Sequence, residues 1–245
     1  MPISDLVLEK IEEYSIFVDW NMAFAGKSMG NRHLFRVNKI AMHLHDQEGG
    51  DIDVVLAGAW LHDVGLVEGN EGHCFKGMRI ARELLEKLGV DEGTITKVLH
   101  CIEAHDGEVE ATTVEAKIVH DADTIDKMGP LGAIRHAWKM ANIAEKRYTA
   151  LDLLEMLPDH LAERQAKLYF ESSRKLVDKY HRAMREFFVN REMARKVIHR
   201  VIDMARDGVP SDVIINKLLA DESLPVEFLE ALEEQSTISL LQELG

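Results

Sequence analysis

The stretch Gly58–His73, GAWLHDVGLVEGNEGH, decides the fold and the chemistry of this chain. Its first half is apolar and stops at His62 and Asp63, and glycines and acidic residues then lead to His73. Imidazole nitrogens and carboxylate oxygens are both ligands of divalent transition metals. We therefore expect a buried helix that ends at Gly65 with His62 and Asp63 near its end, and a short loop that brings His73 towards them.

On both sides of this stretch, apolar residues recur at spacings of three and four, which is the period of an amphipathic helix. Gly49 stops one such pattern, and Thr112 with Glu115 forms a capping box that opens another. Strand signals are nearly absent. Helices are expected in the segments 33–50, 51–65, 77–90, 91–107, 115–129 and 131–146. The sequence therefore predicts an all-α bundle.

The composition changes after about Tyr148, and the sequence beyond it indicates long, charged, amphipathic helices. Glycine is absent between Gly132 and Gly208, and the tail after it indicates two further short helices. We expect a core domain over residues 1–148, with its site-bearing part at about 30–140. Residues 149–245 are expected to form a helical extension that packs on the core or in a homo-oligomer interface.

The formal net charge of −14 argues against a nucleic-acid partner, because phosphate repels such a surface. A small phosphate ester remains compatible with a local basic patch. The chain shows no signal peptide and no apolar run of membrane-spanning length, so we expect no membrane partner. Cys74 and Cys101 fit a reducing, cytoplasmic compartment, and both are expected to be plain buried residues.

The histidines are placed at the ends of the expected helices. His33 opens one helix, His105 ends another, and Asp123 lies inside a third, so these side chains and His62-Asp63 could converge on one pocket. Because cysteine is missing from this set, a structural zinc cage is disfavoured. A histidine and carboxylate set suits one or two ions of iron, manganese, zinc, cobalt or nickel. The two oxygens of Asp63 could bridge a pair of ions.

The ordered set His33, His62-Asp63 and Asp123 resembles the HD superfamily of metal-dependent phosphohydrolases. The resemblance covers about residues 30–140 and does not extend over the last hundred residues. The segments that carry the resemblance are NRHLFRVNKIA, DVVLAGAWLHDVG, HCFKGMRIARELL, CIEAHDGE and KIVHDADTIDKMGPLGAIR. It implies an HD-domain helical bundle over residues 1–148, followed by the extension.

The resemblance also implies roles for the residues that match. The first metal would be held by His33, His62, Asp63 and Asp123. His73 and His105 stand at the two positions that the dinuclear branch of the family adds, so a second metal bridged by Asp63 is expected.

Two neighbouring aspartates have other expected roles. Asp121 is the weaker alternative to Asp123 as a ligand. Asp126 is expected to orient a histidine ligand or to hold a basic residue.

The expected activity is hydrolysis of a nucleotide or another small phosphate ester by metal-activated water, with Asp63 or a neighbour as the proton acceptor. Basic side chains suited to the phosphate are Arg36, Lys76, Lys127 and Arg135. A lysine that many family members carry after the His-Asp pair is missing, because Leu66 and Val67 occupy that region. The general acid is therefore open, with Glu68 or Glu71 as candidates.

Two other functions remain open at this stage. Some HD-fold proteins are di-iron oxygenases with a similar order of ligands. The chain could also be a binding or regulatory module in which the metal is only structural. The sequence does not identify the substrate, the metal or the oligomeric state.

Overall fold

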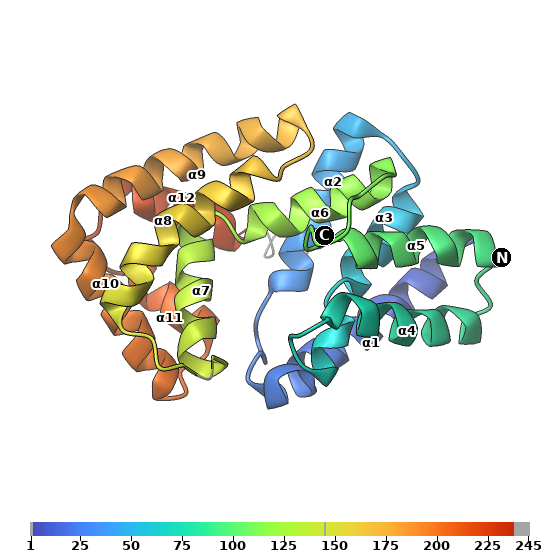
Figure 1. Cartoon of the computed structure of the whole chain (residues 1–245), viewed down its shortest axis with the longest axis horizontal. Helices are drawn as coiled ribbons and strands as arrows, with labels where there is room; N and C mark the ends of the chain where they lie inside the picture. Colours follow the sequence, from blue (N-terminus) through green and yellow to red (C-terminus); the bar gives the residue numbers. More distant parts are fainter. Residues whose placement is uncertain (1, 145, 238–245) are drawn as a thin grey trace. The chain divides into compact units, whose positions relative to one another are not determined.

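The computed structural model describes residues 2–144 and 146–237, and these form twelve α-helices, two short 3-10 helices and no strand (Figure 1). The all-α prediction is confirmed. The chain divides into two compact units, Met1–Thr124 and Ile125–Gly245. This division lies inside helix α6, and the domain boundary expected after Tyr148 stays a prediction.

The first unit holds the helices that bring the candidate metal ligands together. Helix α3 lies at its centre, against α1, α2 and α5, and α4 packs on α5 and on the 3-10 helix η2. The apolar residues of α2 that recur at helical spacing are all buried, as expected. The elements are α1 (Asp5–Asn21), η1 (Ala23–Gly26), α2 (His33–Glu48), α3 (Ile52–Leu61), η2 (Val64–Glu68), α4 (His73–Lys87), α5 (Glu92–Ala104) and α6 (Val114–Asp126).

A glycine allows α3 and α5 to approach each other closely. A Cβ at Gly58 would lie 2.6 Å from the Cβ of Cys101 on α5, which is too close for any side chain. This approach places the ends of the two helices side by side. The imidazole rings of His62, after α3, and His105, after α5, are consequently 4.9 Å apart between centroids.

The predicted end of the central helix at Gly65 was wrong. Helix α3 ends at Leu61, and after Asp63 the chain tightens into η2. Gly65 is needed for a different reason, which is its packing against α4. A Cβ there would lie 2.0 Å from the carbonyl oxygen of His73 and 2.6 Å from the backbone nitrogen of Gly77.

The capping box predicted from Thr112 and Glu115 was also wrong. The backbone N–H of Ala116 donates to the Thr113 hydroxyl, so Thr113 caps α6, which begins at Val114. The carboxylate of Glu115 instead accepts from the backbone N–H of Asp51. Thr112 contacts the His100 side chain. Thr112 and Glu115 therefore both make tertiary contacts, which a local sequence pattern cannot reveal.

The second unit is also helical. Helix α7 packs against α9, α10 and α12, and α9 buries the side chains of Val177, Tyr180, Met184 and Phe187. The helices are α7 (Gly129–Asn142), α8 (Ala150–Ala166), α9 (Glu171–Val189), α10 (Arg191–Arg206), α11 (Ser211–Leu219) and α12 (Val226–Thr237). No helix in the described ranges combines the length and the apolar character that crossing a lipid bilayer requires.

Candidate metal centre

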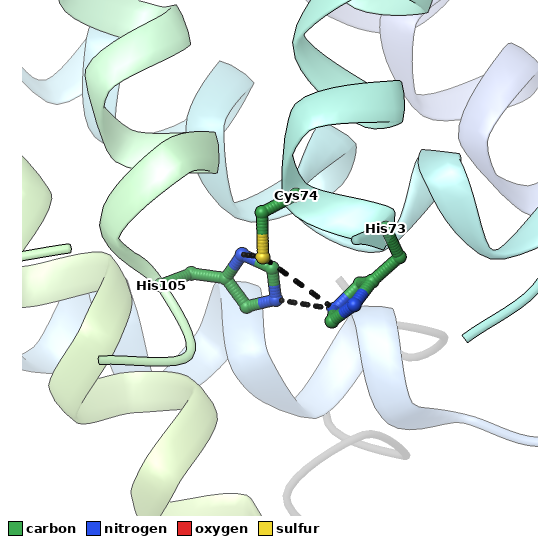
Figure 2. A group of neighbouring side chains, drawn as sticks. All are labelled: His73, Cys74 and His105. Atoms are coloured by element: carbon green, nitrogen blue, oxygen red, sulfur yellow. Dashed lines mark hydrogen bonds between the residues drawn. The ribbon is translucent and has the colours of Figure 1, made fainter. Parts of the chain in front are cut away.

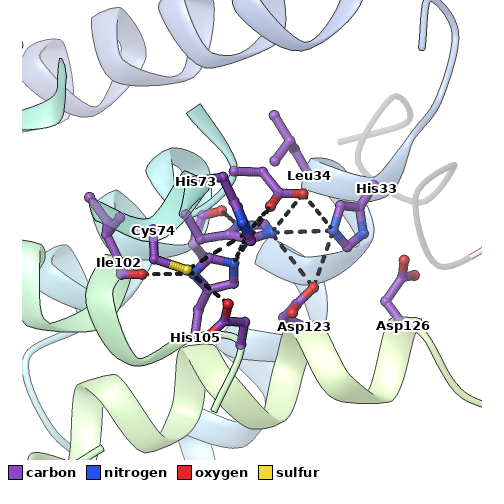
Figure 3. Close-up of polar contacts among 12 residues, drawn as sticks. His33, Leu34, His73, Cys74, Ile102, His105, Asp123 and Asp126 are labelled. Atoms are coloured by element: carbon purple, nitrogen blue, oxygen red, sulfur yellow. Dashed lines mark hydrogen bonds and ion pairs between the residues drawn. The ribbon is translucent and has the colours of Figure 1, made fainter. Parts of the chain in front are cut away.

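Four side chains of the first unit meet at what we call the first cluster, which consists of His33, His62, Asp123 and the Oδ2 atom of Asp63 (Figure 3). The Nε2 atom of His33 lies 3.2 Å from that of His62, 3.2 Å from Asp123 Oδ1 and 3.4 Å from Asp63 Oδ2. His62 Nε2 lies 3.5 Å from Asp63 Oδ2 and 3.6 Å from Asp123 Oδ1.

The other oxygen of Asp63 belongs to a second cluster, formed by His73, His105 and Asp63 Oδ1. The Nε2 atoms of the two histidines are 3.2 Å apart, and each lies 3.5 Å from Asp63 Oδ1. In Figure 3, His33 and Asp123 lie on one side of the group, and His73 and His105 lie on the other. Asp63 therefore divides its two oxygens between two sets of imidazoles.

These separations fit the coordination shell of a metal ion. Nitrogen and oxygen ligands lie about 2.0–2.1 Å from zinc and similar ions, which puts neighbouring ligand atoms about 2.8–3.0 Å apart in octahedral geometry and about 3.3–3.4 Å apart in tetrahedral geometry. The measured distances of 3.2–3.6 Å lie close to this range. Both clusters thus have the atoms and the spacing to hold a divalent ion.

Backbone carbonyls fix which nitrogen of three imidazoles faces the clusters. His62 Nδ1 lies 2.7 Å from the Ala59 carbonyl, and His105 Nδ1 lies 2.7 Å from the Ile102 carbonyl. His73 Nδ1 lies 3.0 Å from the Asn70 carbonyl. A carbonyl only accepts, so each Nδ1 carries a proton, and each Nε2 is the nitrogen that can bind an ion. This is the tautomer that a metal ligand requires.

The clusters combine buried ligand atoms with one solvent-facing side. His62 and His105 are fully buried, whereas the side chains of Asp63 and His73 are 13% and 14% exposed. Burial acts to raise the pKa of the Asp63 carboxyl, but the charge of His62 and hydrogen bonds from the surrounding imidazoles outweigh it and hold that pKa well below its usual range. Burial lowers the pKa of His105 and favours its neutral form.

The structure distinguishes between the two aspartates that competed for the ligand role. Asp123 faces the first cluster. Asp121 lies 3.0 Å from His120 Nδ1, in a separate buried pair.

The four basic residues expected at the phosphate have varied surroundings. Arg36 is buried in α2 one turn after His33. The Lys76 amine donates to the carbonyls of Glu68 and Glu71, so it ties down the loop between η2 and α4. Lys127 and Arg135 lie in the second unit. Their role as substrate ligands stays a prediction, as it does for the other two.

Asp126 holds a basic residue, which is one of its two expected roles. Its carboxylate, 2% exposed, accepts a hydrogen bond from the Arg135 guanidinium within the second unit. Among the candidates for the general acid, Glu68 forms an ion pair with Arg79 on the surface.

Cys74 is the residue that the sequence argument missed. Its thiol donates to Asp106 Oδ2 at 3.0 Å, and its sulfur lies 3.8 Å from His73 Nε2 and 3.7 Å from His105 Nδ1 (Figure 2). The adjacency of Cys74 to His73 was the available signal. The prediction of a plain buried thiol rested on the small number of cysteines rather than on that neighbour.

Comparison with known proteins finds a family match over the part of the chain that carries the two clusters. The family model of the HD domain matches residues 31–128, a range that contains every residue of the two clusters. Ribonuclease Y of Fusobacterium nucleatum is 33% identical over 98 residues, which are 40% of this chain and 18% of the relative. Ribonuclease Y of Thermobifida fusca is 36% identical over 98 residues, again 18% of the relative. The chain thus spans about a fifth of the length of these relatives.

Solved structures match over more of the chain. An HD-superfamily hydrolase from Bacillus thuringiensis is 28% identical, with a TM-score of 0.57 over 75% of this chain and 95% of the other. A Lactobacillus plantarum protein has a TM-score of 0.61 at 21% identity, over 78% of this chain and 97% of that one, and this match supports the fold alone.

Proposed function

Because residues 31–128 of this chain belong to the HD-domain family, we propose that the protein is a metal-dependent phosphohydrolase that acts on a nucleotide or another small phosphate ester. The observation that carries the proposal is the position of Asp63, whose two oxygens face the Nε2 atoms of two separate sets of imidazoles. A divalent ion held there supplies a Lewis acid that polarises a phosphoryl oxygen and makes water a better nucleophile near neutral pH.

In this proposal each residue of the two clusters has a specific role. The metal would be held by four buried side chains, those of His33, His62, His105 and Asp123, together with the partly exposed His73 and Asp63. Asp63 and His73 form the solvent-facing side, so the phosphate ester would approach there. Asp63 is ionised near neutral pH, and in this proposal Asp63 or a neighbouring carboxylate accepts the proton of the attacking water.

The test begins with elemental analysis of the protein purified without oxygen. A panel of phosphomonoesters and phosphodiesters is then assayed with the metal that is found. We expect Asp63→Ala to lose metal and hydrolysis together. Asp53→Asn is the matched control, because Asp53 lies in the first turn of α3, at the opposite end of that helix from Asp63. Full metal occupancy in D63A would refute the assignment.

A second candidate is cleavage of RNA phosphodiester bonds, which the similarity to ribonuclease Y favours. The net charge of −14 argues against it, since a polyanion is repelled. A short single-stranded RNA in the same panel decides between them. Oxygen consumption, or retained metal without any turnover, would instead support an oxygenase or a binding module.

A further inference from the structure

We propose that Cys74 supplies a thiolate ligand to a metal ion at the second cluster, which makes that position a mixed nitrogen, oxygen and sulfur site that prefers zinc-like ions to magnesium or manganese. The inference rests on the proposed metal centre but not on its hydrolytic activity. It follows from the position of the sulfur and from the chemistry of the four side chains together.

The distance of the Cys74 sulfur from a ligand nitrogen of the second cluster is close to that expected for two ligands of one metal ion. For a tetrahedral ion with a metal–nitrogen distance of about 2.0–2.1 Å and a metal–sulfur distance of about 2.3 Å, a sulfur and a nitrogen ligand lie about 3.6 Å apart. The Cys74 sulfur lies 3.8 Å from His73 Nε2. The nitrogen and oxygen atoms of the second cluster are 3.2–3.5 Å apart, close to the tetrahedral spacing of about 3.4 Å.

The number of donors at the second cluster supports the same inference. Without the sulfur, the second cluster offers three ligand atoms, two imidazole nitrogens and Asp63 Oδ1. Cys74 is buried, and its sulfur lies 3.8 Å from His73 Nε2 and 3.7 Å from His105 Nδ1, the nitrogen of that ring that faces the Ile102 carbonyl (Figures 2 and 3). A fourth donor completes a tetrahedral shell.

The thiol of Cys74 must lose its proton before the sulfur can bind a metal ion. A metal binds the thiolate, so the proton must leave the sulfur when the bond to the metal forms. The thiol already donates to Asp106 Oδ2, and the other oxygen of Asp106 accepts from the backbone N–H of Glu108. Asp106 is half-exposed and can pass that proton on to solvent. Proton and charge therefore balance without another reactant.

The consequence is selectivity between the two positions. The first cluster offers only nitrogen and oxygen, which suit iron and manganese as well as zinc. Thiolate is a soft ligand that favours zinc and cobalt over magnesium and manganese. The two positions of one centre would then differ in their preferred ion.

The test uses the full-length protein, stripped of metal and titrated with Co²⁺ without oxygen. We expect a thiolate-to-cobalt charge-transfer band in the near ultraviolet from the wild type. Cys74→Ser should bind Co²⁺ without this band, while Cys101→Ser, at the buried thiol between α3 and α5, should keep it. X-ray absorption of the zinc-loaded protein should show a sulfur scatterer at about 2.3 Å.

A competing chelator then measures affinity. Cys74→Ser should weaken one zinc equivalent about tenfold or more and leave the other unchanged. Wild-type protein that binds two Co²⁺ ions with no charge-transfer band would overturn the inference, as would a band that persists in C74S. Either result leaves the phosphohydrolase proposal intact if the panel shows turnover. Failure to bind any metal would refute both.

Discussion

Gly65 and His73 are in backbone contact, and a Cβ at position 65 would lie 2.0 Å from the His73 carbonyl oxygen. The contact joins the 3-10 helix that follows Asp63 to the first turn of α4. It therefore sets the distance between the Asp63 carboxylate and the His73 imidazole of the second cluster. Gly65 carries no ligand atom itself, but its close packing on α4 determines how the candidate ligands Asp63 and His73 are placed relative to each other.

Gly65→Ala should consequently disturb the second cluster more than the first. The overlap with backbone atoms forces η2 and α4 apart, and we expect a loss of about 2–3 kcal/mol in the free energy of unfolding, as in overpacked cores. Metal content should fall by one equivalent. Gly93→Ala is the control, since a Cβ there meets only the Asp91 side chain, at 3.3 Å. Unchanged stability and metal content in G65A would contradict this account.

Single histidine variants should separate the two clusters. His105→Ala removes a ligand from the second cluster only, so one equivalent of metal should be lost and its affinity should fall at least about tenfold. His33→Ala should affect the other equivalent. The exposed His43 on α2 provides the control. The measurement is metal stoichiometry after gel filtration, and simultaneous loss of both ions from H105A would argue against two separable positions.

Lys76→Ala should loosen a loop rather than weaken substrate binding. The amine donates to the Glu68 and Glu71 carbonyls at 3.0 and 2.7 Å, which leaves it engaged with the backbone. We expect faster cleavage after these glutamates by a glutamate-specific protease and a KM that changes less than about twofold, since an exposed charged hydrogen bond contributes about 1 kcal/mol or less. Lys97→Ala on α5 is the control. A large rise in KM with unchanged proteolysis would instead make Lys76 a substrate ligand.

Stability should depend on pH through His136 and His160 in the second unit, whose rings are 4.4 Å apart. Burial and then the charge of Arg164 lower their pKa values from 6.5 to about 4 and about 3. The unfolded chain therefore binds protons that the folded chain does not, and stability is lost as the pH falls below 6.5.

The size of this loss is modest because both rings are partly exposed. We expect about 1 kcal/mol between pH 6.5 and pH 5, measured by denaturant unfolding. A variant with His136→Gln and His160→Gln should show a shallower decline than the wild type. Parallel curves for the two proteins would assign the pH dependence to other groups.

The sequence predicted the helices and most of the ligand set because those signals are local. The period of apolar residues in α2 identifies its buried face. Gly49 directly follows the end of α2, and Gly89 lies just beyond the end of α4. The ordered histidines and aspartates carry the family resemblance, which the match over residues 31–128 confirms. The end of α3 and the start of α6 were predicted wrongly, since tertiary contacts of Gly65 and Thr112 override the local pattern there.

By itself, then, the sequence determined an all-α chain with an HD domain and a candidate set of metal ligands. The tertiary structure decided which atoms of these ligands meet: the two oxygens of Asp63 face different histidines, and Asp123 rather than Asp121 joins the first cluster. It also placed Cys74 beside the second cluster. The physical reason is that helical periodicity fixes the face of each residue, whereas the distance between side chains on separate helices depends on how closely those helices pack, here through Gly58 and Gly65.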